Sequence, residues 1–182
     1  ARRMAEIGVP IVRSIGGRAT FEGADAAYYA PDKVIIGRGL RTNAAGVAQV
    51  TATLEQMGVS TVQMDMPVGY GSMHLMGMLR IVDKDLAIGY PVRLAHSAME
   101  TLQAAGHAVH FLPDPDEATR GFGFNFVTLG PRKILMAANN PVTQAFFESL
   151  GIECVTVEID ELSKAAGAIG CLSGVVEREI IR

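Results

Sequence analysis

The sequence predicts an α/β fold in which a strand–strand–helix–strand (ββαβ) unit occurs three times. Three glycines mark the repeat, Gly58, Gly106 and Gly151, and they are spaced 48 and 45 residues apart. Each glycine follows an apolar helical stretch and precedes an extended one, and glycine often ends helices because it tolerates the left-handed backbone conformation. Repeats of this kind can close radially, so that loops from every unit meet at one end of an axis. We therefore expect an α/β propeller.

The first unit covers approximately residues 20–67. Residues 21–29 predict its first strand, and the apolar stretch 33–37 predicts a second strand after a Pro-Asp turn. Residues 43–57 predict a helix, because apolar side chains recur there at helical spacing. The alternating stretch 59–65 predicts the closing strand. The apolar positions that indicate the helix are Val47, Val50, Leu54 and Met57.

The next two units have the same order of elements. The second unit covers approximately residues 72–113, with strands at 73–82, 85–88 and 108–112 and a helix at 93–105. The third unit covers approximately residues 123–159, with strands at 124–129 and 133–138, a helix at 142–150 and an extended stretch at 152–159. An ordinary α/β sandwich has no reason to repeat this order, so the repetition favours the propeller.

The two ends of the chain predict a domain that extends beyond this sequence. Residues 1–10 are typical of the end of an uncapped helix that runs into a strand. We therefore expect residues 1–182 to be the carboxyl-terminal part of a single propeller domain, with residues 160–182 completing the ring. Because three units leave apolar faces unpaired, we expect the isolated chain to self-associate, with a homo-oligomer as one form.

The composition narrows the classes of protein and of partner. With 49% apolar and 19% charged residues, the chain is not typical of a disordered protein. A net charge of -3 gives no reason to expect nucleic acid as a partner. The apolar runs are too short to cross a bilayer, so no membrane partner is expected. The two cysteines, Cys154 and Cys171, offer neither a disulfide scaffold nor a metal-binding pair, and they favour a reducing, cytoplasmic location.

Three side chains with catalytic chemistry lie where strands are expected to open. Glu22 opens the first unit, His74 opens the second, and Cys171 opens a fourth, incomplete strand after the third unit. In a radial arrangement, equivalent strand ends meet near the axis. A thiolate there could attack, an imidazole could move protons, and a carboxylate could orient the imidazole. The trio therefore indicates nucleophilic thiol chemistry.

Each of these residues also has a structural interpretation. A lone cysteine in a glycine-rich segment is usually a small core residue, which is how we interpret Cys154. A histidine between apolar neighbours is commonly a core residue, and Glu22 before a glycine can cap a turn. A zinc site would need ligands at a spacing that the sequence does not offer. Each residue taken alone favours the structural interpretation, whereas the three together favour catalysis.

The motifs around these residues resemble the guanidino-group-modifying (pentein) superfamily, which includes arginine deiminases, dimethylarginine dimethylaminohydrolases and amidinotransferases. The resemblance covers essentially the whole chain and implies a five-bladed α/β propeller of ββαβ units. The segments that carry it are Phe21-Glu-Gly-Ala-Asp25, Gly39-Leu-Arg-Thr-Asn43, Met73-His-Leu75, Asn125-Phe-Val-Thr-Leu129, Gly151-Ile-Glu-Cys-Val155, Asp160-Glu-Leu162 and Gly170-Cys-Leu-Ser173.

The resemblance implies a role for each residue of the site. Cys171 would attack the guanidino carbon, His74 would act as general acid and base, and Glu22 would orient His74. The covalent amidino-thiol intermediate would then be released by water or by an acceptor amine, without a metal or an organic cofactor. The substrate-binding positions that the resemblance implies are Arg41, Asn125 and Asp25. The expected partner is a small, arginine-like guanidino substrate.

Two departures from the superfamily pattern bear on the substrate. Met76 stands where most members have an aspartate that contacts the guanidinium, and the lost contact is worth about 1.5–3 kcal/mol. Residues 165–167 lack the arginine that arginine deiminases carry before the nucleophile. Both departures argue against a standard deiminase of free arginine. The leading hypothesis is a hydrolase, the first alternative is an amidinotransferase with the same trio, and the second is a propeller-fold binding protein without catalysis.

Overall fold

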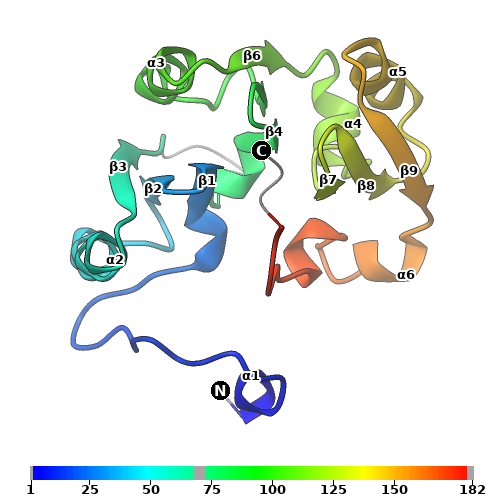
Figure 1. Cartoon of the computed structure of the whole chain (residues 1–182). Helices are drawn as coiled ribbons and strands as arrows, with labels where there is room; N and C mark the ends of the chain where they lie inside the picture. The colour runs from blue at the N-terminus through cyan, green and yellow to red at the C-terminus, as the bar shows by residue number, and fades with distance from the viewer. Residues whose placement is uncertain (1, 68–72, 180–182) are drawn as a thin grey trace.

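The computed structural model describes residues 2–67 and 73–179 and contains three separate three-stranded sheets. In each sheet the first two strands are antiparallel, and the third lies parallel to the second after a helical crossover. Figure 1 shows β1, β4 and β7 toward the middle of the molecule and the crossover helices on its outside. The predicted threefold ββαβ repeat is confirmed, whereas closure into a five-bladed ring stays a prediction.

The three units contain the expected elements in the expected order. The first unit consists of β1 (Ala26–Ala30), β2 (Lys33–Arg38), α2 (Ala44–Gln56) and β3 (Ser60–Asp65). The second consists of β4 (Leu79–Asp83), β5 (Leu86–Gly89), α3 (His96–Ala104) and β6 (Ala108–Phe111). The third consists of β7 (Val127–Gly130), β8 (Lys133–Ala137), α5 (Pro141–Ser149) and β9 (Glu153–Val157).

The ends of the three crossover helices have the same hydrogen bonds in every unit. Gly58, Gly106 and Gly151 all have positive φ, at 79°, 90° and 76°. In each unit the amide of this glycine donates to the carbonyl three residues earlier, at 3.0 Å. The next amide donates five residues back, which satisfies a second carbonyl at the helix end. The glycine signal that defined the repeat in the sequence thus has a direct backbone cause.

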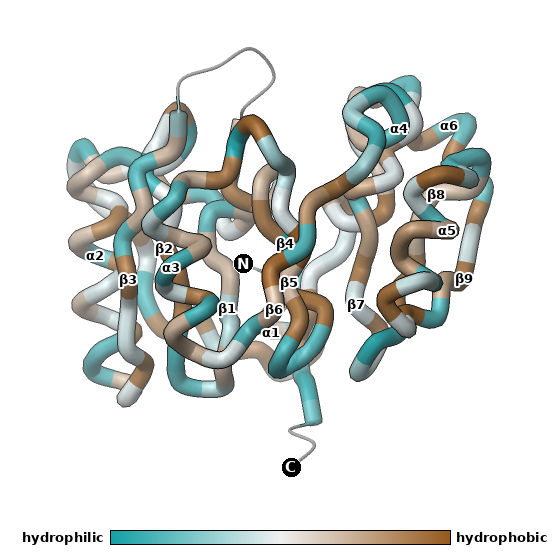
Figure 2. The backbone as a smooth tube through the Cα atoms, turned by 90° about the horizontal axis from the view of Figure 1, so that it is seen from above, coloured by the Kyte–Doolittle hydropathy of each residue, from teal (hydrophilic) through white to brown (hydrophobic). Residues whose placement is uncertain are grey.

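The apolar core lies mostly between successive units. One cluster joins the first and second units through Ile35 and Met64 on one side and Leu75 and Leu102 on the other. A second cluster joins the second and third units and includes the edge-to-face pair of Phe126 and Phe147. The inner strands also contact in succession, β1 with β4 and β4 with β7. Figure 2 shows the units following one another across the molecule, from α2 to β9. Each unit therefore completes its core against its neighbour.

The segments that open the units differ from the prediction, because they are turns rather than the first residues of long strands. A 3-10 turn, η1 (Gly23–Asp25), precedes β1, and another, η2 (Leu75–Gly77), precedes β4. In all three units an amide donates three residues back, from Asp25 to Glu22, from Gly77 to His74 and from Asn125 to Phe122. Each turn occupies residues that were predicted to begin the following strand. The strands predicted at 21–29, 73–82 and 124–129 are therefore too long at their starts.

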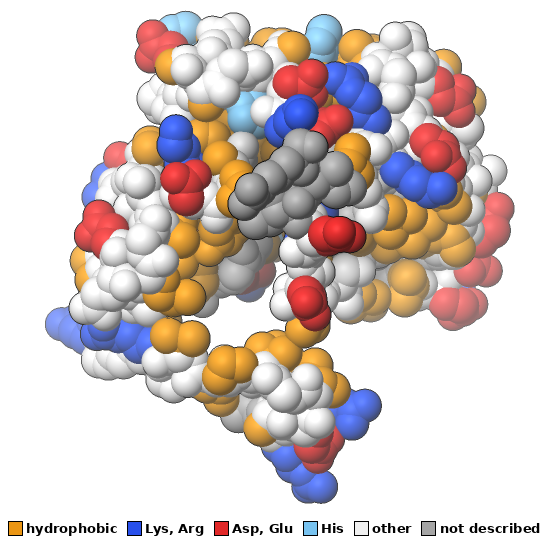
Figure 3. Space-filling model, in the orientation of Figure 1, with side chains coloured by type: hydrophobic (Ala, Val, Ile, Leu, Met, Phe, Trp, Pro, Cys, Tyr) orange, Lys and Arg blue, Asp and Glu red, His pale blue; other side chains and the backbone are white. Residues whose placement is uncertain are grey.

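The two ends of the chain also differ from the prediction. After the short helix α1 (Arg2–Glu6), no strand forms in residues 7–22. After β9 come α6 (Asp160–Ser163) and the 3-10 turn η3 (Gly170–Leu172), which carries Cys171, so the fourth strand is not formed within the described residues. Figure 3 shows the amino-terminal segment projecting from the units with apolar side chains on its surface. The exposed apolar residues of this segment are Met4, Ile7, Ile11 and Val12.

Two helices were not predicted, α4 (Pro115–Thr119) and α6. Helix α4 lies between the second and third units, and the Asp114 carboxylate caps it by accepting from the amides of Asp116 and Glu117. The Asp-Pro-Asp-Glu sequence is a recognisable start signal for a helix, with a proline in the first turn. No helix among the described residues is long and apolar enough to cross a membrane.

Candidate functional site

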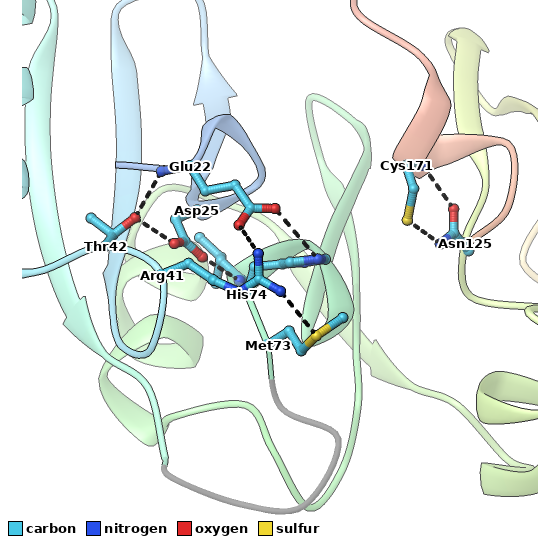
Figure 4. A network of polar contacts seen from close by, with 9 residues as sticks. Glu22, Asp25, Arg41, Thr42, Met73, His74, Asn125 and Cys171 are labelled. Carbon is cyan, nitrogen blue, oxygen red and sulfur yellow. Dashed lines mark hydrogen bonds and ion pairs between the residues drawn. The ribbon is translucent and has the colours of Figure 1, made fainter. Parts of the chain in front are cut away.

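The residues predicted to form the site come from the opening turns of the units, from the segment between β2 and α2, which carries Arg41, and from η3. Figure 4 shows them in two groups, with Glu22, Arg41 and His74 on one side and Cys171 and Asn125 on the other. The first group belongs to the first two units, and the second joins the third unit to the carboxyl-terminal segment. The described contacts run within each group, and no hydrogen bond among them joins Cys171 to His74.

The first group is built around the carboxylate of Glu22. The Glu22 Oε1 atom lies 3.8 Å from His74 Nε2, and Oε2 accepts a hydrogen bond from Arg41 Nη1 at 3.3 Å. The His74 side chain is 14% exposed, compared with 52% for Arg41. The buried His74 Nδ1 atom has no hydrogen-bond partner among the described residues. A carboxylate in this place can orient an imidazole.

The second group holds the exposed thiol of Cys171. The Asn125 amide donates from Nδ2 to Cys171 Sγ at 2.8 Å, and its Oδ1 accepts from the Cys171 backbone amide at 3.2 Å. The Gly170 amide also donates to the Asn125 carbonyl. A side chain at Gly170 would lie 2.7 Å from Asn125 Oδ1, so glycine is needed for the turn to approach this closely. Asn125 therefore holds the turn that carries Cys171 through both the nitrogen and the oxygen of its side-chain amide.

A cavity of about 210 Å³ is lined by His74 from the first group and by Asn125 from the second. Its other walls are mainly apolar and aromatic, with one guanidinium group from Arg93 stacked 4.4 Å above the Tyr90 ring. Residues Met76, Phe122 and Phe124 supply much of the apolar surface. A planar cation could lie against such walls, since aromatic faces attract cations.

Asp25 occupies a different position from the one predicted for a substrate ligand. The residue is fully buried, and both of its carboxylate oxygens are bound by protein groups. Its Oδ2 accepts from the Thr42 hydroxyl at 2.5 Å, and its Oδ1 accepts from the Leu75 amide at 2.9 Å. Burial raises the pKa of Asp25 above its usual value, although both hydrogen bonds oppose this. Asp25 is therefore held by protein groups, and its role as a substrate ligand stays a prediction.

Two residues that support the site, Thr42 and Arg80, were not predicted as site residues. Thr42 is buried and links the opening turn of the first unit to Asp25. Arg80, on β4, donates to the Phe126 carbonyl and places its guanidinium 4.7 Å from the centre of the Phe126 ring. Burial lowers the pKa of Arg80 to about 10, while the Cys171 thiolate opposes the shift. Thr42 lies in the motif that pointed to Arg41, which was its only signal.

Among the residues that the structure describes, no three histidine, cysteine or acidic side chains gather as metal ligands do.

Comparison with known proteins identifies one family. The sequence model of the arginine deiminase family matches residues 3–117 and 113–178. The N(G),N(G)-dimethylarginine dimethylaminohydrolase of Streptomyces coelicolor is 35% identical over 155 residues, which cover 85% of this chain and 54% of that protein. The chain spans about half the length of the curated relatives it matches.

Solved structures have the same fold. A dimethylarginine dimethylaminohydrolase mutant from Pseudomonas aeruginosa, complexed with citrulline, aligns with a TM-score of 0.65 at 23% identity, over 84% of this chain and 55% of that one. An inosamine-phosphate amidinotransferase from Streptomyces griseus aligns with a TM-score of 0.70 at 13% identity, over 93% of this chain and 52% of that one.

Proposed function

Because this chain belongs to the arginine deiminase family, as its motifs indicated, we propose that it carries the reaction centre of a cysteine-dependent hydrolase. The enzyme would break a C–N bond in the guanidino group of an arginine-like substrate. The observation that carries the proposal is the contact between Asn125 and Cys171. It holds an exposed thiol beside the cavity that His74 lines.

In the proposed reaction Cys171 is the nucleophile. Its thiolate attacks the guanidino carbon, and the bond from that carbon to the leaving nitrogen breaks. His74 donates a proton to this nitrogen, which leaves as ammonia or an amine. The product of this step is a covalent amidino-thiol intermediate on Cys171. The hydrogen bond from Asn125 supports this role, because it stabilises negative charge on the sulfur before attack and after release.

His74 then activates the water that completes the reaction. The neutral imidazole takes a proton from water, whose oxygen bonds to the same carbon while the carbon–sulfur bond breaks. The products are a ureido compound and the regenerated thiolate. Glu22 supports this cycle because its carboxylate lies on the Nε2 side of the ring and stabilises the imidazolium form. In this proposal the substrate lies between the two groups of Figure 4 and brings Cys171 and His74 into contact with one molecule.

The cavity supports a substituted guanidino group as substrate. Its apolar wall includes Met76, so the wall has no negative charge at this position to pair with an unsubstituted guanidinium. Methyl groups on the guanidino nitrogen would instead be buried against Met76 and the neighbouring phenyl rings. The identity with a dimethylarginine dimethylaminohydrolase favours the same substrate class.

An amidinotransferase would use the same residues with an amine in place of water. The fold alone allows it, since an amidinotransferase aligns with this chain at low identity. Water is proposed because the curated relative with 35% identity is a hydrolase. The two reactions are separated by adding primary amines to the assay and measuring whether the amidino group passes to them.

The test is turnover by the protein expressed at the full length of its reading frame. Arginine and N-methylated arginines are supplied, and released ammonia or amine is measured together with the ureido product. We expect Cys171→Ser to lower kcat by about a thousandfold or more, because the nucleophile is lost. Cys154→Ser is the matched control and should keep wild-type turnover. Full activity of Cys171→Ser would overturn the proposal.

A further inference from the structure

A buried chain of hydrogen bonds connects the three segments that carry Glu22, Arg41 and His74. The Glu22 backbone amide donates to the Thr42 hydroxyl at 3.1 Å, and this hydroxyl donates to Asp25 Oδ2. Asp25 Oδ1 in turn accepts from the Leu75 amide. This series of hydrogen bonds therefore begins at Glu22 and ends at Leu75, the residue after His74. Thr42, within the series, is the residue after Arg41.

The residues of this hydrogen-bond series are more deeply buried than the site residue Glu22. Thr42, Asp25 and Leu75 are all fully buried, whereas the Glu22 side chain is 36% exposed. The Thr42 hydroxyl accepts one bond and donates another, and each Asp25 oxygen is occupied. Because hydrogen bonds in a low-dielectric interior are costly to leave unmade, this arrangement admits few alternatives.

The hydrogen bonds also cross between two repeat units. Glu22 and Thr42 belong to the first unit, and Leu75 belongs to the opening turn of the second. The Glu22–His74 pair spans the same boundary, so its 3.8 Å separation depends on how the two turns are held together. The bond from Asp25 to the Leu75 amide is a direct polar link between these turns.

We propose that Thr42 and Asp25 are positioning residues that set the separation of Glu22 and His74 for the reaction. This inference rests on the proposed function, because it assigns Glu22 and His74 their roles there. It replaces the predicted role of Asp25 as a substrate ligand with a role behind the site. Thr42 is needed for its hydroxyl, since one oxygen must both accept and donate.

The experiment compares Thr42→Val with Thr42→Ser in the full-length protein. Valine has the shape of threonine but no hydroxyl, whereas serine keeps the hydroxyl. We expect Thr42→Val to lower kcat by about 10- to 100-fold with little change in KM, because catalytic groups are misplaced rather than lost. Thr42→Ser should restore kcat to within about threefold of the wild type. Rates are expressed per reactive thiol, so that unfolded protein is not counted.

Thr143→Val is the matched control. Thr143 is also fully buried, but its hydroxyl has no hydrogen-bond partner among the described residues. This variant should keep wild-type kcat. The double variant Thr42→Val with Glu22→Gln should have a kcat within about threefold of that of Glu22→Gln alone, because both changes act on the Glu22–His74 pair.

Crystal structures of the two Thr42 variants give a readout that does not depend on turnover. We expect the 3.8 Å separation of Glu22 and His74 to persist in Thr42→Ser and to lengthen by about 1 Å in Thr42→Val. Wild-type kcat and an unchanged separation in Thr42→Val would overturn the inference while leaving the proposed function in place. Equal losses in Thr42→Val and Thr42→Ser would overturn it too. Turnover that survives Cys171→Ser would instead refute the proposed function.

Discussion

In the first repeat unit the opening turn carries a buried carboxylate, whereas in the third unit it carries an amide that binds an exposed thiol. Glu22 and Asp25 belong to the first turn, and Asn125 contacts Cys171 from the third. The two units share the order of their elements, and the amides of Ser60 and Glu153 make equivalent hydrogen bonds of 2.7 Å. The repeated frame therefore fixes the position of each opening turn, and the side chains on that turn determine what it does.

The second unit shows the same separation of roles. Its opening turn carries His74, and its frame repeats the helix stop at Gly106. One frame position differs, because His107 follows this glycine where the other units have Val59 and Ile152. The histidine is buried, and both ring nitrogens lack a hydrogen-bond partner among the described residues. Substitutions at such frame positions test how far the units are interchangeable.

The largest effect on stability is expected for Gly46→Ala. Gly46, Ala98 and Thr143 all lie three residues after a helix N-cap, and Gly46 lies against the backbone of Thr20. A Cβ atom at Gly46 would lie 1.9 Å from the Thr20 carbonyl oxygen. We expect this variant to lower the free energy of unfolding by about 3 kcal/mol, measured by urea denaturation.

The control for this prediction is Ala98→Gly at the equivalent position of the second unit. It should cost only about 1 kcal/mol, through the lower helix propensity of glycine. If Gly46→Ala unfolds at the wild-type urea concentration, the first unit does not depend on this close approach.

The second largest effect concerns the two cysteines, which lie in different environments of the third unit and its carboxyl-terminal extension. Burial raises the pKa of Cys154 to about 11, with Glu148 contributing, so the thiol form persists at neutral pH. Cys171 is exposed and accepts a hydrogen bond from Asn125. We expect iodoacetamide to modify Cys171 about 100-fold faster than Cys154 in the folded protein, measured by peptide mapping. Faster labelling of Cys154 would contradict the assignment of the nucleophile.

A smaller effect is expected for His107→Ile, which places in the second unit the residue type that Ile152 provides at the equivalent position of the third. Burial lowers the pKa of His107, although Asp85 and Asp83 nearby oppose the shift. Because the unfolded chain then binds the proton more tightly, stability should fall as the pH drops below about 6.5 and through the folded pKa. We expect the variant to be more stable than the wild type by about 1 kcal/mol at pH 5, in thermal unfolding experiments.

At pH 8 the pH-dependent part of this gain should be absent, because His107 is neutral in both states. His96→Gln is the control, since His96 is 73% exposed and pairs with Glu100 one helical turn away. The same acid sensitivity in the wild type and in His107→Ile would assign it to other groups.

The smallest effect is expected for Thr143→Val in the third unit. The hydroxyl of Thr143 is buried without a partner among the described residues, so its removal gives up no hydrogen bond. We expect the free energy of unfolding to change by less than about 0.5 kcal/mol. A small increase is expected, because burying a hydroxyl without a hydrogen bond costs free energy. A loss above 1 kcal/mol by calorimetry would reveal an interaction of this hydroxyl.

The sequence by itself determined the repeated frame. The glycines at 58, 106 and 151 and the apolar spacing of residues 43–57 depend on interactions within about one helical turn, which a local pattern records. The family followed from short motifs for the same reason, and the arginine deiminase family model confirmed it. Helix α4 was overlooked, although the Asp114 cap at its start was recognisable in the sequence.

Only the tertiary structure decided how the opening turns are held. The motif of Asp25 indicated a substrate-binding residue, whereas in the structure its carboxylate accepts a hydrogen bond from Leu75, 50 residues further along the chain. Asn125 likewise reaches Cys171 across 46 residues, and Thr42 binds Asp25 across 17. These contacts depend on which units become neighbours and how closely their turns approach. Local patterns carry no record of such distances, because burial and hydrogen bonding between turns arise only when the units pack against each other.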